Sequence, residues 1–237
     1  MDITGSTALV TGANRGLGRE FAAQLLQRGA AKVYAAARDP RQVDVPGVEP
    51  MELDLLDPAS IERAAAQAAD VTLLVNNAGV TTGQNLVRGD LAGARREMDV
   101  NFWGTLGVTR AFADGLGRHG GGAVLNVLSA LSWFSYNGAT AYAASKAAEW
   151  SLTNATRVEL AAQGTQVTGV ALGAADTDMM AGYDGPLLDP ADVVRIALDG
   201  LAAGVGEVLV DDWSRTARDG VASDPVEFYA RVAAPGL

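Results

Sequence analysis

Short apolar segments alternate with longer amphipathic segments along most of the chain. The short segments are rich in β-branched and other apolar residues: Thr7–Val10, Lys32–Ala37, Val71–Val75, Ala123–Leu128, Gln166–Leu172 and Glu207–Val210, with Val48–Leu53 as a weaker member. The longer segments carry helix-forming residues at helical spacing: Leu17–Arg28, Pro58–Ala69, Asp90–Leu116, Ala141–Gln163 and Pro190–Ala203. This alternation predicts an α/β fold with a parallel sheet and helices on both faces. A helical bundle is the competing interpretation, but it leaves the glycines at the strand ends unexplained.

The chain is predicted to form one domain over residues 1–237, because no internal repeat or low-complexity linker divides it. Residues 40–50 are expected to form a loop around the weak strand. A short substrate lid is expected at about residues 178–190, and a polar tail at residues 211–237.

Composition removes several chemistries. The net charge of −10 argues against a general nucleic-acid or anionic-membrane surface. Cysteine is absent, which excludes disulfides, thiolate catalysis and cysteine-based zinc sites, and no metal site is predicted. A serine hydrolase would have to use His119, the single histidine, as its base. The chain lacks a signal-peptide pattern and a long apolar run, so we expect a soluble, cytoplasmic protein.

A glycine-rich turn follows the first apolar segment at once and opens the first helix. Its sequence, residues 11–18, is Thr-Gly-Ala-Asn-Arg-Gly-Leu-Gly. Glycines there permit a tight turn and close approach of a pyrophosphate, and the helix N-terminus offers N–H groups and partial positive charge. The turn therefore predicts dinucleotide binding, with an ordinary strand-to-helix turn as the alternative. The predicted contacts are Gly12, Asn14, Arg15, Gly16, Leu17 and Gly18.

The end of the second apolar segment bears on cofactor choice. Dinucleotide-binding proteins that prefer NAD carry an acidic residue near there, whereas this chain has Arg38. With Arg15, Arg38 could form a cationic fork for a 2′-phosphate, since guanidinium matches phosphate geometry. The pair predicts NADP(H) over NAD(H). Asp39 could weaken this effect or itself reach a ribose, and solvated surface arginines are the alternative.

Tyr142 and Lys146 stand four residues apart on a predicted helix, so their side chains share one face. A tyrosine with its ordinary pKa of about 10 is a poor acid–base catalyst at neutral pH. A nearby ammonium favours the phenolate and lowers that pKa. The spacing therefore suggests an acid–base pair, although a solvated pair is the usual reading of this spacing alone.

Several separated motifs together resemble the short-chain dehydrogenase/reductase family over residues 5–210. They are the glycine turn, Asn76-Asn77-Ala78-Gly79, Asn101, Ser129 and Tyr142-Ala143-Ala144-Ser145-Lys146, in the family's order. The resemblance implies a doubly wound Rossmann-type sheet and an NAD(P)-dependent oxidoreductase. It also implies that Asn101, Ser129, Tyr142 and Lys146 form the catalytic set.

Within this set, Ser129 is expected at the carboxyl end of its strand, where its hydroxyl can bond a substrate carbonyl. A turn-initiating serine is the alternative, and Ser132 lies nearby. The resemblance implies that Asn101 supports a water-linked proton path to Lys146, and it also allows a structural role at a backbone kink. The further cofactor contacts that it implies are Asp54, Leu55, Asn77, Ala78, Gly79, Tyr142, Lys146 and Thr177.

One turn departs from the family pattern. The family commonly has Pro-Gly where this chain has Leu172-Gly173, and Ala175 stands where Val or Ile is usual. The backbone N–H of Ala175 can still donate to a carboxamide, so we count it as a cofactor contact. Without the fixed φ of proline, we expect looser positioning of the nicotinamide and of Thr177.

The substrate pocket is expected between residues 131–140, the residues after Gly79, and residues 178–188. Its apolar side chains suit a lipophilic or aromatic ketone or aldehyde. They are Trp133, Phe134, Tyr136, Met179, Met180 and Tyr183, which could instead pack in the core or on a partner subunit. The segments Asp90–Leu116 and Ala141–Gln163 correspond to helices that commonly form homodimers and homotetramers in the family.

These observations predict an NADPH-dependent carbonyl reductase that acts on a small-molecule substrate. An NADP(H)-binding regulatory or scaffold protein of the same fold is the alternative, and Leu172 is its one support. Oxidation of a secondary alcohol is a third possibility. A sugar-nucleotide epimerase fits less well, because that branch is longer and has different glycine spacing.

Overall fold

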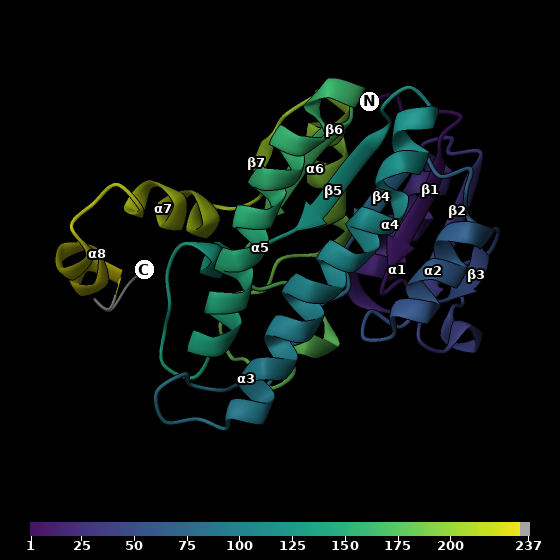
Figure 1. Cartoon of the computed structure of the whole chain (residues 1–237). Coiled ribbons are helices and arrows are strands. Elements are labelled where there is room, and N and C mark those ends of the chain that lie inside the picture. Colours follow the sequence, from purple (N-terminus) through teal and green to yellow (C-terminus); the bar gives the residue numbers. More distant parts are fainter. Residues whose placement is uncertain (233–237) are drawn as a thin grey trace.

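A seven-stranded parallel sheet organises the computed structural model, which describes residues 1–232. Its spatial order is β3-β2-β1-β4-β5-β6-β7 (Figure 1). The strands are β1 (Thr7–Thr11), β2 (Lys32–Ala37), β3 (Glu49–Glu52), β4 (Leu73–Asn76), β5 (Ala123–Val127), β6 (Gln166–Ala171) and β7 (Glu207–Leu209). The predicted doubly wound α/β sheet is confirmed, and its strand bounds agree with the apolar segments to within about two residues.

Helices cover both faces of the sheet and enclose two apolar cores. They are α1 (Gly16–Gln27), α2 (Pro58–Gln67), α3 (Leu91–Met98), α4 (Thr105–Arg118), α5 (Thr140–Glu159), α6 (Pro190–Ala202), α7 (Asp212–Gly220) and α8 (Pro225–Val232). Val10 packs in one core with Phe21 of α1, whereas the preceding residue, Leu9, packs in the other core with Phe112 of α4. Successive strand residues face opposite sides, which explains why these strands are apolar throughout.

The sheet reverses its winding between β1 and β4, which pair in parallel with each other. Open α/β sheets bind ligands outside the carboxyl ends of the strands at such a switch point. Thr11, Asn76 and Val127 end β1, β4 and β5 at this edge. The fold therefore directs attention to the loops that follow these three strands.

The segment predicted as one helix over Asp90–Leu116 is interrupted. Between α3 and α4 the chain forms a π-helical turn, Asp99–Gly104. Asn101 lies in this turn, fully buried, and its side chain bonds the backbone of Val80 in both directions, at 2.9 Å and 2.8 Å. This exchange of hydrogen bonds fixes the turn, and π-helical turns occur often at functional sites.

The prediction of a polar tail from residue 211 is wrong over residues 212–232, where α7 and α8 form. Both helices lie at the end of the molecule opposite β3 (Figure 1). A capping box between Asp211 and Ser214 begins α7, and Phe228 of α8 packs with Phe134. Their few apolar residues depend on tertiary packing, so sequence periodicity alone missed them. Residues 233–237 of the predicted tail lie outside the described residues.

The predicted lid contains a short 3₁₀ turn, Asp178–Met180, and is held at its base by a bridge between Ala175 and Leu188. Within residues 1–232, no helix has both the length and the apolar character needed to cross a membrane.

Candidate active site

A cavity of about 1090 Å³ opens at the carboxyl edge of the sheet. Its walls include the glycine turn and the side chains of Ser129, Tyr142 and Lys146. Three of the four predicted catalytic residues therefore face the same space as the predicted cofactor turn. Asn101 lies behind this wall, fully buried.

The glycine turn has the shape that a pyrophosphate site requires. Gly12 and Gly16 have φ of +67° and +52°, in the region that favours glycine. A Cβ on Gly18 would lie 2.1 Å from the carbonyl oxygen of Gly12, so the turn admits no side chain there. Within residues 1–232, no side chain caps the N-terminus of α1. The N–H groups of this helix end are therefore available to an anionic group, and the turn fits a dinucleotide.

Thr11 ties the glycine turn to the end of β4. Its Oγ1 accepts hydrogen bonds from the N–H groups of Asn77 and Ala78, each at 3.0 Å. The Asn77 side chain donates back to the Thr11 carbonyl at 2.9 Å. Asn77, Ala78 and Gly79 consequently lie along the cavity beside the turn, where the resemblance puts the adenosine ribose.

The two arginines of the predicted phosphate fork, Arg15 and Arg38, both line the cavity but have different surroundings. Arg38 is exposed, lines the cavity, and makes no ion pair within residues 1–232. Asp39 turns away to Arg41, with Nε–Oδ1 at 2.8 Å, and this partner lowers the pKa of Asp39. Arg15 pairs with Asp178 at 3.2 Å, and both of these side chains are largely exposed. Of the two arginines, Arg38 is therefore the one without an ion-pair partner within residues 1–232.

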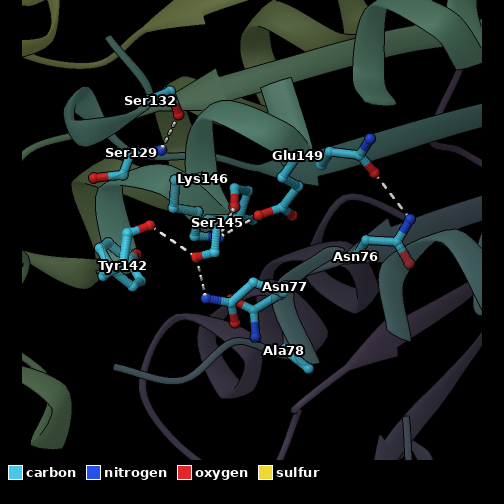
Figure 2. Close-up of polar contacts among 12 residues, drawn as sticks. Asn76, Asn77, Ala78, Ser129, Ser132, Tyr142, Ser145, Lys146 and Glu149 are labelled. Atoms are coloured by element: carbon cyan, nitrogen blue, oxygen red, sulfur yellow. Dashed lines mark hydrogen bonds and ion pairs between the residues drawn. The ribbon is translucent and has the colours of Figure 1, made fainter. Parts of the chain in front are cut away.

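Lys146 is held firmly beside Tyr142 (Figure 2). Its Nζ donates to the Val127 carbonyl at 2.8 Å and to Glu149 at 2.6 Å, and it lies 5.8 Å from the centre of the Tyr142 ring. Ser129 is buried, and its Oγ accepts the Leu131 N–H at 3.1 Å. The i, i+4 prediction for Tyr142 and Lys146 is consistent with this geometry.

The charges of the site act on each other. Burial raises the pKa of Tyr142, while the Lys146 ammonium and the Ser129 hydroxyl lower it, and the net pKa lies above its usual value. Burial alone would lower the pKa of Lys146, but the Glu149 carboxylate and Tyr142 raise it above its usual value. Glu149 was missed from the sequence, although its i+3 spacing from Lys146 was a signal.

Asn101 supports the start of α5 through one intermediary. Its Nδ2 donates to the Ser145 hydroxyl at 2.9 Å, and that hydroxyl donates to the Tyr142 carbonyl at 2.7 Å. A Cβ on Gly79 would lie 3.3 Å from Asn101 Oδ1 and 3.7 Å from Lys146 Nζ, so this glycine keeps both groups close. The structural role at a backbone kink is thus evident, and the proton path stays a prediction.

The turn after β6 is held by a residue from beyond β7. The Gly173 N–H donates to the Asp211 carboxylate at 3.2 Å, in the turn where the family has proline. Ala175 is buried on the cavity wall, and its N–H makes no hydrogen bond within the described chain. Thr177 lies against the glycine turn, because a Cβ on Gly16 would be 3.2 Å from Thr177 Cγ2. Both residues are therefore placed where a cofactor in the cavity could reach them.

The family model "short chain dehydrogenase" matches residues 6–185. The chain belongs to this family. A short chain dehydrogenase from Burkholderia cenocepacia, solved in complex with NADP, is 39% identical, with a TM-score of 0.93 over 99% of this chain and 100% of that one. The predictions of family, enzyme class and Rossmann-type fold are thereby confirmed, and the chain is an NAD(P)-dependent oxidoreductase.

Two curated relatives of this dehydrogenase are reductases by name. The NADPH-dependent 1-acyldihydroxyacetone phosphate reductase of Schizosaccharomyces pombe is 31% identical over 77% of this chain, which spans 64% of that protein. Carbonyl reductase [NADPH] 2 of Sus scrofa is 34% identical over 72% of each chain.

The lining of the cavity differs from the predicted substrate pocket in two respects. Trp133 does not line the cavity, because its ring packs edge-on against Trp150 at 6.3 Å, with the Arg218 guanidinium 5.5 Å away. The C-terminal helices add walls that the sequence reading missed, among them Trp213 and Tyr229. The other predicted substrate-pocket residues do line the cavity: Phe134, Tyr136, Met179, Met180 and Tyr183. The predicted cofactor contacts Asp54 and Leu55 also line it.

Proposed function

We propose that this dehydrogenase reduces the carbonyl group of a small apolar or aromatic ketone or aldehyde with NADPH. The observation that carries the proposal is the position of Ser129, Tyr142 and Lys146 on the wall of the cavity that also contains the glycine turn. A nucleotide held by that turn and a carbonyl near Ser129 and Tyr142 occupy one continuous space.

The cofactor is NADP(H). NADP is bound in the Burkholderia cenocepacia structure, and both curated reductases carry NADPH in their names. In this chain the open turn from Gly12 to Gly18 would hold the pyrophosphate, and Arg38 would bind the 2′-phosphate. The Ala175 N–H and Thr177 would contact the nicotinamide end, and Asp54 with Leu55 the adenine end.

NADPH, when bound, supplies the hydride that reduces the carbonyl carbon. The Ser129 hydroxyl donates a hydrogen bond to the carbonyl oxygen and stabilises the negative charge that develops there. Tyr142 transfers its phenolic proton to that oxygen, which completes the alcohol and leaves a phenolate. Lys146 stabilises the phenolate by its charge until a proton from solvent restores the phenol. Asn101 keeps the first turn of α5 in place through Ser145.

The proposed substrate class is supported by apolar side chains on the cavity wall. Phe134, Tyr136 and Trp213 line the cavity, and the lid adds Met179 and Met180. Aromatic and thioether side chains contact apolar ligands well, and methionine adapts to irregular shapes. A lipophilic or aromatic carbonyl compound suits these side chains better than a charged or sugar-like one.

The decisive experiment compares the wild type with Tyr142→Phe. A panel of aromatic and aliphatic ketones should support NADPH oxidation by the wild type, and Tyr142→Phe should lower kcat by at least about a hundredfold. NADPH binding, followed by fluorescence, should persist in the variant, because the cofactor turn is untouched. Full turnover by Tyr142→Phe would overturn the mechanism, and a wild type inactive across the panel would overturn the reaction.

We also propose a homodimer or homotetramer built on the long helices. Trp103, beside α4, and Val158, on α5, are 57% and 77% exposed. Large apolar side chains this exposed on neighbouring helices suit a subunit interface. Sedimentation should give a mass of two or four chains, and Val158→Glu should shift it towards one.

A further inference from the structure

A buried carboxylate contacts the proposed catalytic lysine. Glu149 stands one helical turn after Lys146 on α5, and its Oε2 is 2.6 Å from Lys146 Nζ (Figure 2). The two side chains are 1% and 4% exposed. Within residues 1–232, Lys146 is the one cation that forms an ion pair with Glu149.

A carboxylate at this position is costly to bury. Moving two ions out of water carries a large desolvation cost that their attraction must offset, and apolar residues of similar volume often serve stability as well or better. The site could be packed without a charge, since Lys146 already donates to the Val127 carbonyl at 2.8 Å. Stability alone is therefore a weak reason for Glu149.

The carboxylate changes what Lys146 does to Tyr142. An ammonium beside a phenol lowers its pKa, because the positive charge favours the phenolate. Glu149 opposes this effect and raises the pKa of Tyr142. Glu97 of α3, whose carboxylate accepts hydrogen bonds from Thr82, acts in the same direction but less strongly. Among the described residues, the charged groups that act on Tyr142 are Lys146, Glu149 and Glu97, and the Ser129 hydroxyl acts on it from the turn after β5.

We infer that Glu149 is a positioning residue that fixes the Lys146 ammonium and offsets part of its charge, so that Tyr142 keeps its proton at neutral pH and is set to donate it to a carbonyl. This inference rests on the roles proposed above for Tyr142 and Lys146. Alcohol oxidation, which begins with proton transfer to Tyr142, then requires more alkaline conditions than it would without Glu149.

The direct test is titration of tyrosine by its phenolate absorbance, without substrate. Subtracting the curve of Tyr142→Phe from that of the wild type isolates Tyr142, and the same subtraction is made in the Glu149→Gln background. Gln can still accept the Lys146 hydrogen bond but carries no charge. We expect ionisation of Tyr142 at a pH lower by about one unit or more in Glu149→Gln. Ionisation at the same or a higher pH would overturn the inference.

Three further variants separate the effect of the Glu149 charge from that of its packing. Glu149→Asp keeps the charge and should return the titration towards the wild type, whereas Glu97→Gln should shift it downward by less than Glu149→Gln. If Glu149→Gln does not fold, as judged by circular dichroism, Glu149→Met of similar volume takes the same titration and should give the same downward shift. An unchanged titration in Glu149→Met would equally overturn the inference.

Turnover provides the second readout. In the pH profile of alcohol oxidation with NADP⁺, Glu149→Gln should move the rising limb to lower pH by the same shift as the titration. A wild type that turns over nothing defeats the proposed reaction, yet the titration still decides the role of Glu149. An unshifted oxidation profile in an active enzyme counts against Glu149 alone.

Discussion

The Asp211 carboxylate joins the Gly173 N–H at 3.2 Å and so ties the C-terminal helices to the turn after β6. The same oxygen accepts the Ser214 N–H at 3.1 Å, which begins α7. One side chain thus caps a helix and restrains a turn on the cavity wall. Leu172 precedes that turn in place of the family's proline, and the Asp211 bond supplies a restraint that the backbone there lacks.

Replacing Asp211 with Ala should therefore have two measurable effects. Loss of the cap should lower the free energy of unfolding by about 1–2 kcal/mol in urea titrations. Loss of the turn contact should raise the KM for NADPH, because the N–H groups of this turn are no longer held in place. Asp211→Asn, which keeps an acceptor and caps helices well, is the matched control and should stay near the wild type on both measures. Equal KM values for Asp211→Ala and the wild type would show that the turn does not depend on this contact.

The parts of the site that sequence reasoning could find depend on local rules. The glycine turn and the Tyr142–Lys146 pair follow from backbone sterics and helical spacing, and the structure places them on one cavity. Glu149 obeys the same spacing rule, but its burial is decided by how α5 packs on the sheet. Its charge therefore looked like an ordinary solvated one in the sequence.

The parts that could not be found depend on long-range packing. The apolar residues of α7 and α8 are sparse, and Trp213 reaches the cavity because its ring packs 5.0 Å from that of Phe134, far earlier in the chain. Trp133 was misplaced for the same reason, since its neighbour Trp150 lies on another element. Periodicity reports which residues share a face, and it does not report which faces meet.

Arg38→Ala should reduce the preference for NADPH over NADH. Charge-assisted hydrogen bonds contribute about 1.5–3 kcal/mol, so the ratio of kcat/KM for the two cofactors should fall by about tenfold or more. The fall should be in kcat/KM for NADPH, with kcat/KM for NADH little changed. Arg38 makes no ion pair within residues 1–232, so its removal breaks no such contact in the protein itself. Arg63→Ala removes an exposed arginine that pairs with Asp57 and is the control for net charge. An unchanged ratio in Arg38→Ala would assign the phosphate to another group.

Alkaline unfolding should differ between the wild type and Tyr142→Phe. The pKa of Tyr142 is raised in the folded protein, so above about pH 10 the folded chain binds a proton that the unfolded chain has lost. This contribution to stability is fully present below the unfolded pKa and is lost as pH rises from there through the folded pKa. Phenylalanine cannot ionise, so the stability of the wild type relative to Tyr142→Phe should decline across that window, measured by urea unfolding. If the difference in unfolding free energy between the two proteins stays constant above pH ~10, the pKa of Tyr142 is not raised in the folded protein.

Tyr229→Ala should weaken binding of bulky aromatic ketones. Tyr229 lines the cavity from α8, and its hydroxyl accepts the Ser135 N–H at 2.9 Å, so it contributes a wall and steadies the segment that carries Phe134 and Tyr136. Losing an aromatic contact of about 1–2 kcal/mol should raise the KM for an aromatic ketone by about tenfold and hardly alter that for a small aliphatic one.

Two variants on α8 sharpen this test. Val226→Ala changes a side chain that is 78% exposed and does not line the cavity, so it should leave both KM values unchanged. Tyr229→Phe keeps the ring and loses the bond to Ser135, so its KM should lie between those of the wild type and Tyr229→Ala. If Tyr229→Ala raises the KM for the aromatic and the aliphatic ketone equally, α8 supports the site as a whole and does not select the substrate.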